Sequence, residues 1–227
     1  MLFRSAGDYV TGTLRELWQT RYGAAGPGFV LASKAWPTYI RNGWRIGDAG
    51  WKSSSYVFAS LKSGRYGPGG VALEAAGGSA SQVSLETALK SACEVQFFHQ
   101  LQPGGGKLKL KADKRAFAEV NTDAEARLAV VKQAFDACPR QLTVEVPAGR
   151  SAQVYGWNVE VPQGGVLWSS MGVISARSTH LTAYDAGHAR EAIATLSPDL
   201  LVLAYDLNLA SVADFPPASY EIGRAHV

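Results

Sequence analysis

Apolar and polar residues alternate in short runs through the middle of the chain. The clearest run is 107–111, where Leu108 and Leu110 stand between three lysines. A period of two predicts a strand with one packed face and one face in solvent. Similar runs follow one another between glycine-rich turns, at 71–74, 94–98, 142–146 and 154–161. Short strands at this spacing predict an antiparallel β-sandwich or jelly roll.

One segment of this region departs from the alternation. In residues 122–137, the apolar residues Leu128, Val131 and Phe135 are spaced roughly as on a helix. The pattern leaves two alternatives open, a short helix or a loop that links two strands.

The two flanks of the alternating region have a different pattern. Apolar residues recur with helical spacing after Asp8, which can cap a helix, and Gly23 ends that helix. Residues 29–31 read as a short buried strand. Near the other end, small apolar residues in 183–196 predict a helix that packs on the apolar run 200–204. A continuous apolar run is typical of a strand buried on both faces of a parallel sheet. The flanks therefore predict an α/β unit into which the β-sandwich is inserted.

A glycine-rich stretch contains four aromatic residues, Trp36, Tyr39, Trp44 and Trp51. Aromatic side chains at this density can line a sugar-binding cleft, or they can pack beneath long loops. The two cysteines also leave alternatives open. Cys93 and Cys138 form a disulfide in an exported protein or stay buried thiols in a cytosolic one.

Composition and charge exclude several function classes. The formal net charge is +3, and no Lys/Arg cluster with interleaved aromatic residues stands out, so nucleic-acid binding is not expected. No apolar run reaches the roughly 18 residues of a membrane span. Neither cysteine has the spacing of a metal ligand, so a zinc site is not expected. We expect no cofactor and no other metal site.

Three segments carry a family resemblance. The run 6–15 contains Ala6-Gly7-Asp8-Tyr9 and resembles the stretch just after the nucleophile of SGNH (GDSL-type) hydrolases. The run 167–177 resembles the second conserved block of that family, and 198–208 resembles the third. The order of the segments and of the inserted β-domain resembles the peptidoglycan O-acetylesterases.

The resemblance implies a fold, an activity and two site residues. The fold would be a partial, flavodoxin-like parallel sheet with helices, plus the inserted antiparallel β-sandwich. The activity would be serine attack on an acetyl ester of a cell-wall or polysaccharide sugar, outside the cytoplasm in the periplasm or beyond. The backbone N–H near Ser175 and the side chain of Asn208 would bind the oxyanion. The substrate partner would be an acylated carbohydrate; the sequence leaves the oligomeric state open.

The chain departs from the family pattern at its catalytic positions. Phe3 stands roughly where the nucleophile serine belongs, and the Asp-x-x-His pair has no counterpart. Ser175 and Asp206 occupy positions where the family usually has glycine. One interpretation is a fragment of an esterase that is itself inactive. The alternative is a non-catalytic carbohydrate-binding protein on a degenerate SGNH scaffold.

The two ends suggest a reason for these departures. Residues 1–5 and 222–227 can both be back-translated into a common short-read sequencing adapter, in opposite orientations. We therefore expect both ends to be artefacts that flank a gene fragment. The expected organisation is adapter in 1–5, a first hydrolase segment in 6–67, the inserted β-sandwich in 68–163, a second hydrolase segment in 164–221 and adapter in 222–227.

Overall fold

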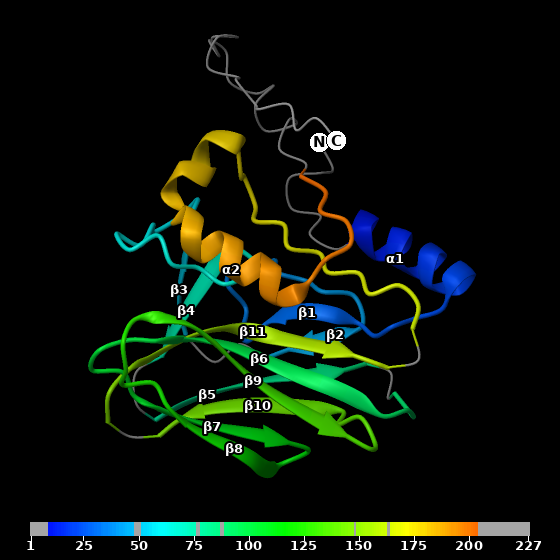
Figure 1. Ribbon diagram of the computed structural model, residues 1–227, viewed down its shortest axis with the longest axis horizontal. Coiled ribbons are helices and arrows are strands. Elements are labelled where there is room, and N and C mark those ends of the chain that lie inside the picture. Colours follow the sequence, from blue (N-terminus) through cyan, green and yellow to red (C-terminus); the bar gives the residue numbers. More distant parts are fainter. Residues whose placement is uncertain are drawn as a thin grey trace.

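The computed structural model describes residues 9–47, 51–75, 78–86, 89–147, 149–162 and 164–203. Within these ranges the chain forms two antiparallel sheets that pack face to face (Figure 1). We call the first the helix-side sheet. Its strand order is β3-β4-β11-β6-β9, and β1 also pairs with β11. Its strands are β1 (Gly28–Leu31), β3 (Lys52–Ser55), β4 (Val71–Ala75), β6 (Cys93–Leu101), β9 (Arg127–Phe135) and β11 (Ala152–Glu160).

The second sheet, which we call the far sheet, has the order β2-β5-β10-β7-β8. Its central strands show the alternation seen in the sequence: in β10 the residues Leu142, Val144 and Val146 are buried and those between them are half-buried. The far sheet therefore has one face in the core and one face toward solvent. Its strands are β2 (Trp44–Ile46), β5 (Ser79–Leu85), β7 (Lys107–Ala112), β8 (Arg115–Asn121) and β10 (Gln141–Val146).

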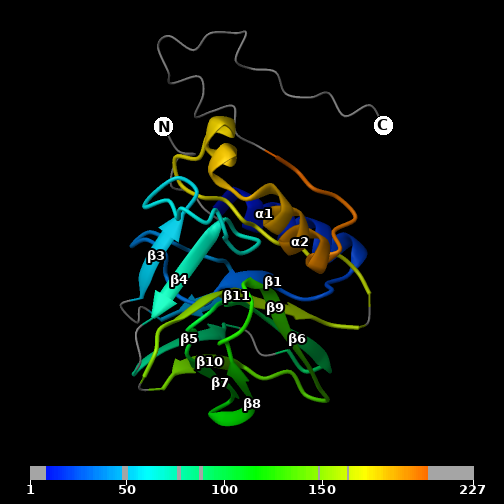
Figure 2. The ribbon, with the colours of Figure 1, turned by 60° about the vertical axis from the view of Figure 1, so that its left-hand side comes forward.

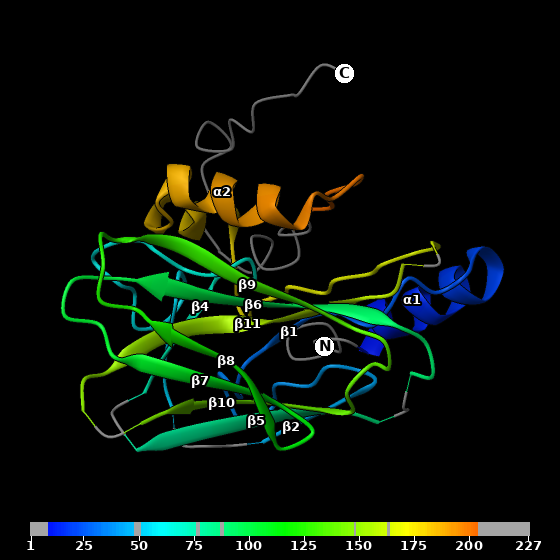
Figure 3. The same ribbon diagram turned by 60° about the horizontal axis from the view of Figure 1, so that its bottom comes forward.

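The helices cover the other sheet. They are α1 (Tyr9–Tyr22), the 3-10 helix η1 (Ser178–Ala183) and α2 (Ala186–Leu196). Figures 1 and 2 show α2 over the helix-side sheet, and Figure 1 shows α1 toward one end of it, near β1. Figure 3 shows α2 above β6, β9 and β11, with the far sheet on the opposite side. As a result, almost every residue of β6 and β11 is buried.

The core lies between the two sheets. Its largest fully buried side chains include Trp157 and Phe97, whose ring centroids are 4.3 Å apart. Of the four aromatic residues of the glycine-rich stretch, Trp44 and Trp51 are buried and Trp36 and Tyr39 pack against the core cluster. Within the described residues, these side chains therefore contribute to packing.

The predicted α/β architecture with a parallel sheet is wrong. Both sheets are antiparallel, and parallel pairing within the described residues is limited to two isolated bridges, Ala24 with Val166 and Gln102 with Asp123. Residues 200–203 of the expected buried strand form no strand, and all four are more than half exposed. An apolar run becomes a buried strand only when neighbouring strands flank it, and no described strand lies beside this run.

The structure also answers the questions left open for residues 122–137 and for the two cysteines. Residues 122–137 contain β9, which is neither a helix nor a loop and pairs with β6 along its whole length. The two cysteines, for which two alternatives were open, form the disulfide Cys93–Cys138.

The domain boundaries at 68 and 163 stay a prediction. The strands β1, β2 and β3 precede residue 68 and still belong to the two sheets, because β1 pairs with β11, β2 with β5 and β3 with β4. None of the helices within the described ranges has the length and apolar character needed to span a bilayer.

Candidate functional site

The segment 164–177 follows β11 and crosses the helix-covered side of the sandwich, where it appears in yellow in Figure 1. Its first residues are held by the loop that follows α1. The Val166 N–H donates to the Gly23 carbonyl at 2.9 Å, and the Ala25 N–H donates to the Val166 carbonyl at 3.1 Å. The Gln19 amide donates to the same Val166 carbonyl at 2.9 Å. The segment is therefore anchored on α1 and on the approach to β1.

A second contact joins α1 to the middle of this segment. The hydroxyl oxygens of Thr11 and Ser170 lie 2.9 Å apart, although the two residues are 159 positions apart in the chain. Thr11 belongs to the first segment of the family resemblance and Ser170 belongs to the second. The fold thus brings these two segments into contact.

A buried arginine supports the same region. Arg41 is 1% exposed, and its Nε donates to the Phe29 carbonyl at 3.0 Å. Its Nη2 donates to the carbonyls of Pro27 at 2.8 Å and Trp168 at 2.6 Å. A buried guanidinium is tolerated only when carbonyl or carboxylate groups satisfy it, so Arg41 fixes segment 164–177 against β1. Sequence reasoning did not identify Arg41, and only its position within an aromatic-rich stretch hinted at burial.

Ser175 lies in a turn near the end of this segment, with an exposed side chain. Its φ angle is +59°, in the left-handed region that favours glycine. Among the described residues no group accepts a hydrogen bond from its backbone N–H. An unengaged N–H in a strained turn is the kind of donor that an oxyanion site uses.

The other predicted site residue, Asn208, lies outside the described residues, as do Asp8 and Asp206. The convergence of the Ser175 N–H and the Asn208 amide on one point therefore stays a prediction. A small cavity of about 10 Å³ lies beside the segment, lined by residues that include Trp36, Tyr39 and Ser170. It holds at most one water molecule, so the described residues form no substrate-sized cleft there. They also contain no group of three or more His, Cys, Asp or Glu that could hold a metal ion.

A buried polar cluster attaches α2 to the sheet. The Tyr155 hydroxyl donates to Gln100 Oε1 at 2.6 Å, accepts from Gln153 Nε2 at 3.1 Å and lies 3.3 Å from His188 Nε2. Burial raises the pKa of Tyr155 and lowers the pKa of His188, so both groups are held neutral. His188 is 5% exposed, so its ring belongs to this buried cluster.

The chain matches no protein-family model and no curated protein. Among solved structures, it is similar to a peptidoglycan O-acetylesterase with a TM-score of 0.77 and 21% sequence identity. The match covers 95% of this chain and 57% of that chain. The likeness is one of fold. The chain spans less than two thirds of the length of that enzyme.

Family 29 carbohydrate-binding modules are also matched, with lower similarity. One has 13% identity and a TM-score of 0.38, over 61% of this chain and 88% of that chain. Another has 12% identity and a TM-score of 0.36, over 60% of this chain and 92% of that chain.

Proposed function

We propose that this chain is a fragment of an SGNH-type serine esterase that removes acetyl groups from cell-wall or polysaccharide sugars, in the periplasm or outside the cell. In this proposal residues 68–163 are the inserted domain, and the segments before and after them belong to the hydrolase. The Ser175 N–H and the Asn208 side chain bind the oxyanion of the tetrahedral intermediate. The chain as it stands lacks the nucleophile serine and the Asp-His pair and is inactive.

The contact between Thr11 and Ser170 is the observation that carries this proposal. It joins two segments that the family resemblance selected from sequence alone and that lie 159 positions apart. An accidental resemblance gives no reason for the two segments to meet. The left-handed turn at Ser175 adds support, since it has the backbone conformation that the family's glycine adopts readily.

Two experiments test the proposal. The first measures hydrolysis of p-nitrophenyl acetate by the purified chain. We expect no turnover above buffer, because loss of a nucleophile alone costs on the order of a million-fold in kcat. Turnover well above buffer by the wild-type chain would contradict the proposal that this chain lacks its nucleophile.

The second experiment recovers the source gene and expresses the extended protein. We expect Gly-Asp-Ser codons before Ala6 and esterase activity in the product. The Asn208→Ala variant should lose about 10²–10³-fold in kcat. Ser175→Gly is the matched control: it keeps the backbone N–H and suits the φ of +59°, so it should retain activity. An extended gene without a serine at this place would favour the alternative, a non-catalytic carbohydrate-binding protein.

A further inference from the structure

The solvent-facing side of the far sheet contains a groove of about 570 Å³. It lies between the edge strand β2 and the turn that joins β7 to β8, and its floor is formed by β5 and the start of β10. The volume falls within the range of about 300–1,000 Å³ that small-ligand pockets have. The groove is on the opposite sheet from segment 164–177, so its role is independent of the proposed esterase site (Figure 1).

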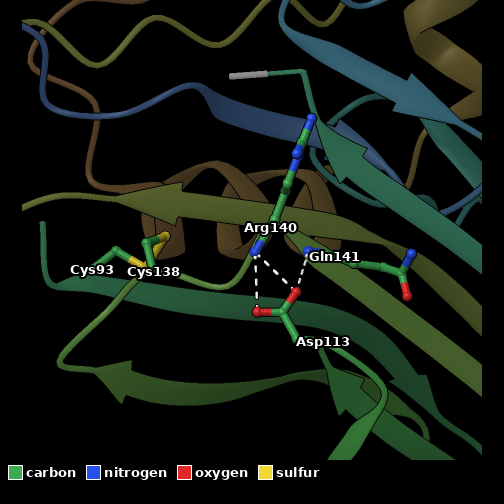
Figure 4. The surroundings of a disulfide bond; sticks show 5 residues. All are labelled: Cys93, Asp113, Cys138, Arg140 and Gln141. Atoms are coloured by element: carbon green, nitrogen blue, oxygen red, sulfur yellow. Dashed lines mark hydrogen bonds between the residues drawn. A yellow bond between two sulfur atoms is a disulfide. The ribbon is translucent and has the colours of Figure 1, made fainter. Parts of the chain in front are cut away.

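The wall of the groove is held in place by the carboxylate of Asp113. Its Oδ1 accepts hydrogen bonds from the backbone N–H groups of Arg140 at 3.1 Å and Gln141 at 2.9 Å (Figure 4). Asp113 and Lys114 have φ angles of +45° and +72°, which fit the tight turn between β7 and β8. Asp113 thus fastens this turn to the first residues of β10.

The floor is fixed in a similar way. The Arg140 Nε donates to the Leu85 carbonyl at 3.3 Å, and its Nη2 donates to the Glu86 carbonyl at 3.2 Å. Two residues before Arg140, the disulfide Cys93–Cys138 ties the chain to β6. A wall and floor that are already ordered lower the entropic cost of binding a ligand.

The charge around the groove is predominantly positive. Arg45, Lys114 and Arg140 line it, and Asp113 is its one lining carboxylate among the described residues. That carboxylate is engaged by backbone N–H groups. The Nε of Arg45 lies 3.9 Å from Oε1 of Glu86, but the Arg45 side chain is 78% exposed and the Glu86 side chain is 51% exposed. This ion pair is therefore weak, and Arg45 can contact a ligand instead. An anionic ligand is therefore favoured.

The uncharged lining groups narrow the ligand class. The neighbouring strands β5 and β10 present amide and hydroxyl groups to the groove, from Gln82, Ser84 and Gln141. These groups can both donate and accept hydrogen bonds, as sugar hydroxyls require. Among the described lining residues there is no aromatic side chain on which a neutral sugar ring could stack. Peptide ligands usually add a strand to a sheet edge or insert apolar side chains into pockets. The floor of this groove is the side-chain face of central strands, so a glycan is favoured over a peptide.

We propose that this groove binds a glycan that carries carboxylate groups. Its carboxylates contact Arg45, Lys114 and Arg140, and its hydroxyls hydrogen-bond to the two glutamines and Ser84. Binding is electrostatic to a large extent and weakens as salt concentration rises.

Calorimetric titration of the whole chain tests this proposal. The probes are trigalacturonate, which is carboxylated, cellotriose, which is neutral, and hexaglutamate, which is acidic but not a glycan. The variant Arg45→Gln/Lys114→Asn, which we call the rim variant, removes two positive charges from the edge of the groove. Asparagine is used at 114 because it tolerates the positive φ there. The control Lys62→Gln/Arg190→Gln removes the same charge from two exposed residues that do not line the groove, of which Arg190 lies on α2.

We expect trigalacturonate to bind at least tenfold more tightly than cellotriose and hexaglutamate. The rim variant should weaken trigalacturonate binding about tenfold, as two partly exposed charge contacts warrant, while the control leaves it within twofold. Absence of trigalacturonate binding, or equal losses in both variants, would overturn the proposal. Equal or tighter binding of cellotriose or of hexaglutamate would also overturn it, in favour of a neutral glycan or an acidic peptide.

Discussion

The two sheets of this protein have similar strands but differ in what lies on their outer faces. The helix-side sheet is covered by α2 and segment 164–177, and polar groups on its covered face pair with one another, as Tyr155, Gln100 and His188 do. None of the described helices covers the outer face of the far sheet, and Gln82 and Gln141 face solvent across a groove there. A covered face must be apolar or fully paired, whereas an open face can keep polar groups available for a ligand. Variants at four places in the two sheets test this contrast.

Truncation of a core side chain of the helix-side sheet should have the largest effect on the free energy of unfolding. Trp157 is fully buried, so Trp157→Ala should lower the free energy of unfolding by about 3–5 kcal/mol. Thr143→Ala, on the open face of β10, should change it by less than about 0.5 kcal/mol. Urea denaturation followed by circular dichroism measures both. Similar losses in the two variants would show that the core between the sheets and the open face of the far sheet do not differ in this way.

The covalent link between the sheets comes next. The disulfide joins β6 of the helix-side sheet to the residues before β10 of the far sheet, across 45 positions. Cys93→Ala/Cys138→Ala should lower the free energy of unfolding by about 2–4 kcal/mol, because the unfolded chain regains its loop entropy. The same variant should bind trigalacturonate more weakly, since the groove floor begins at Arg140. Unchanged stability, measured against oxidised wild type, would contradict this account.

The third prediction concerns a buried histidine of the helix-side sheet. Burial lowers the pKa of His99 from 6.5 to about 4. As the pH falls below 6.5, His99 becomes protonated in the unfolded chain but stays neutral in the folded protein. The free energy of unfolding therefore decreases until the pH reaches about 4. The loss attributable to His99 is about 3 kcal/mol.

The His99→Leu variant measures this contribution. Between pH 7 and pH 4.5 it should lose about 2–3 kcal/mol less than the wild type, while carboxylates titrate equally in both. The strands of the far sheet contain no histidine and contribute no such dependence. A pH profile in the variant parallel to that of wild type would refute the assignment.

The smallest expected effect is on the polar cluster under α2. Tyr155→Phe removes one hydroxyl and should lower the free energy of unfolding by about 1–2 kcal/mol, because Gln100 and Gln153 lose a buried partner. Tyr22→Phe removes an equivalent hydroxyl from an exposed residue of α1 and should have little effect. Hydrogen exchange should locate the loosening in α2. Exchange that increases equally throughout both sheets would argue against a local attachment.

Some features could be predicted from sequence because they rest on local patterns. The alternation at 107–111 and 142–146 predicted β7 and β10, because a side-chain period of two matches a half-buried strand. The helix before Gly23 was predicted from capping and spacing, and α1 ends at Tyr22. Its apolar face, however, stays largely exposed, with Leu17 at 62%.

The candidate site was only partly predictable. The family resemblance selected the segments that contain Thr11 and Ser170, and the fold joins them. Arg41 had no motif and no characteristic spacing, because its role depends on three carbonyl groups that only the folded chain brings together.

The sequence by itself determined where the chain could form half-buried strands, where glycines end a helix and which residues resemble a hydrolase. Only the tertiary structure decided the pairing, which is a matter of contacts between distant residues. Residues 127–135 have roughly helical spacing but form β9, because pairing with β6 provides backbone partners along the whole strand. Residues 200–203 have the composition of a buried strand but remain exposed, because burial requires neighbours that no local pattern supplies.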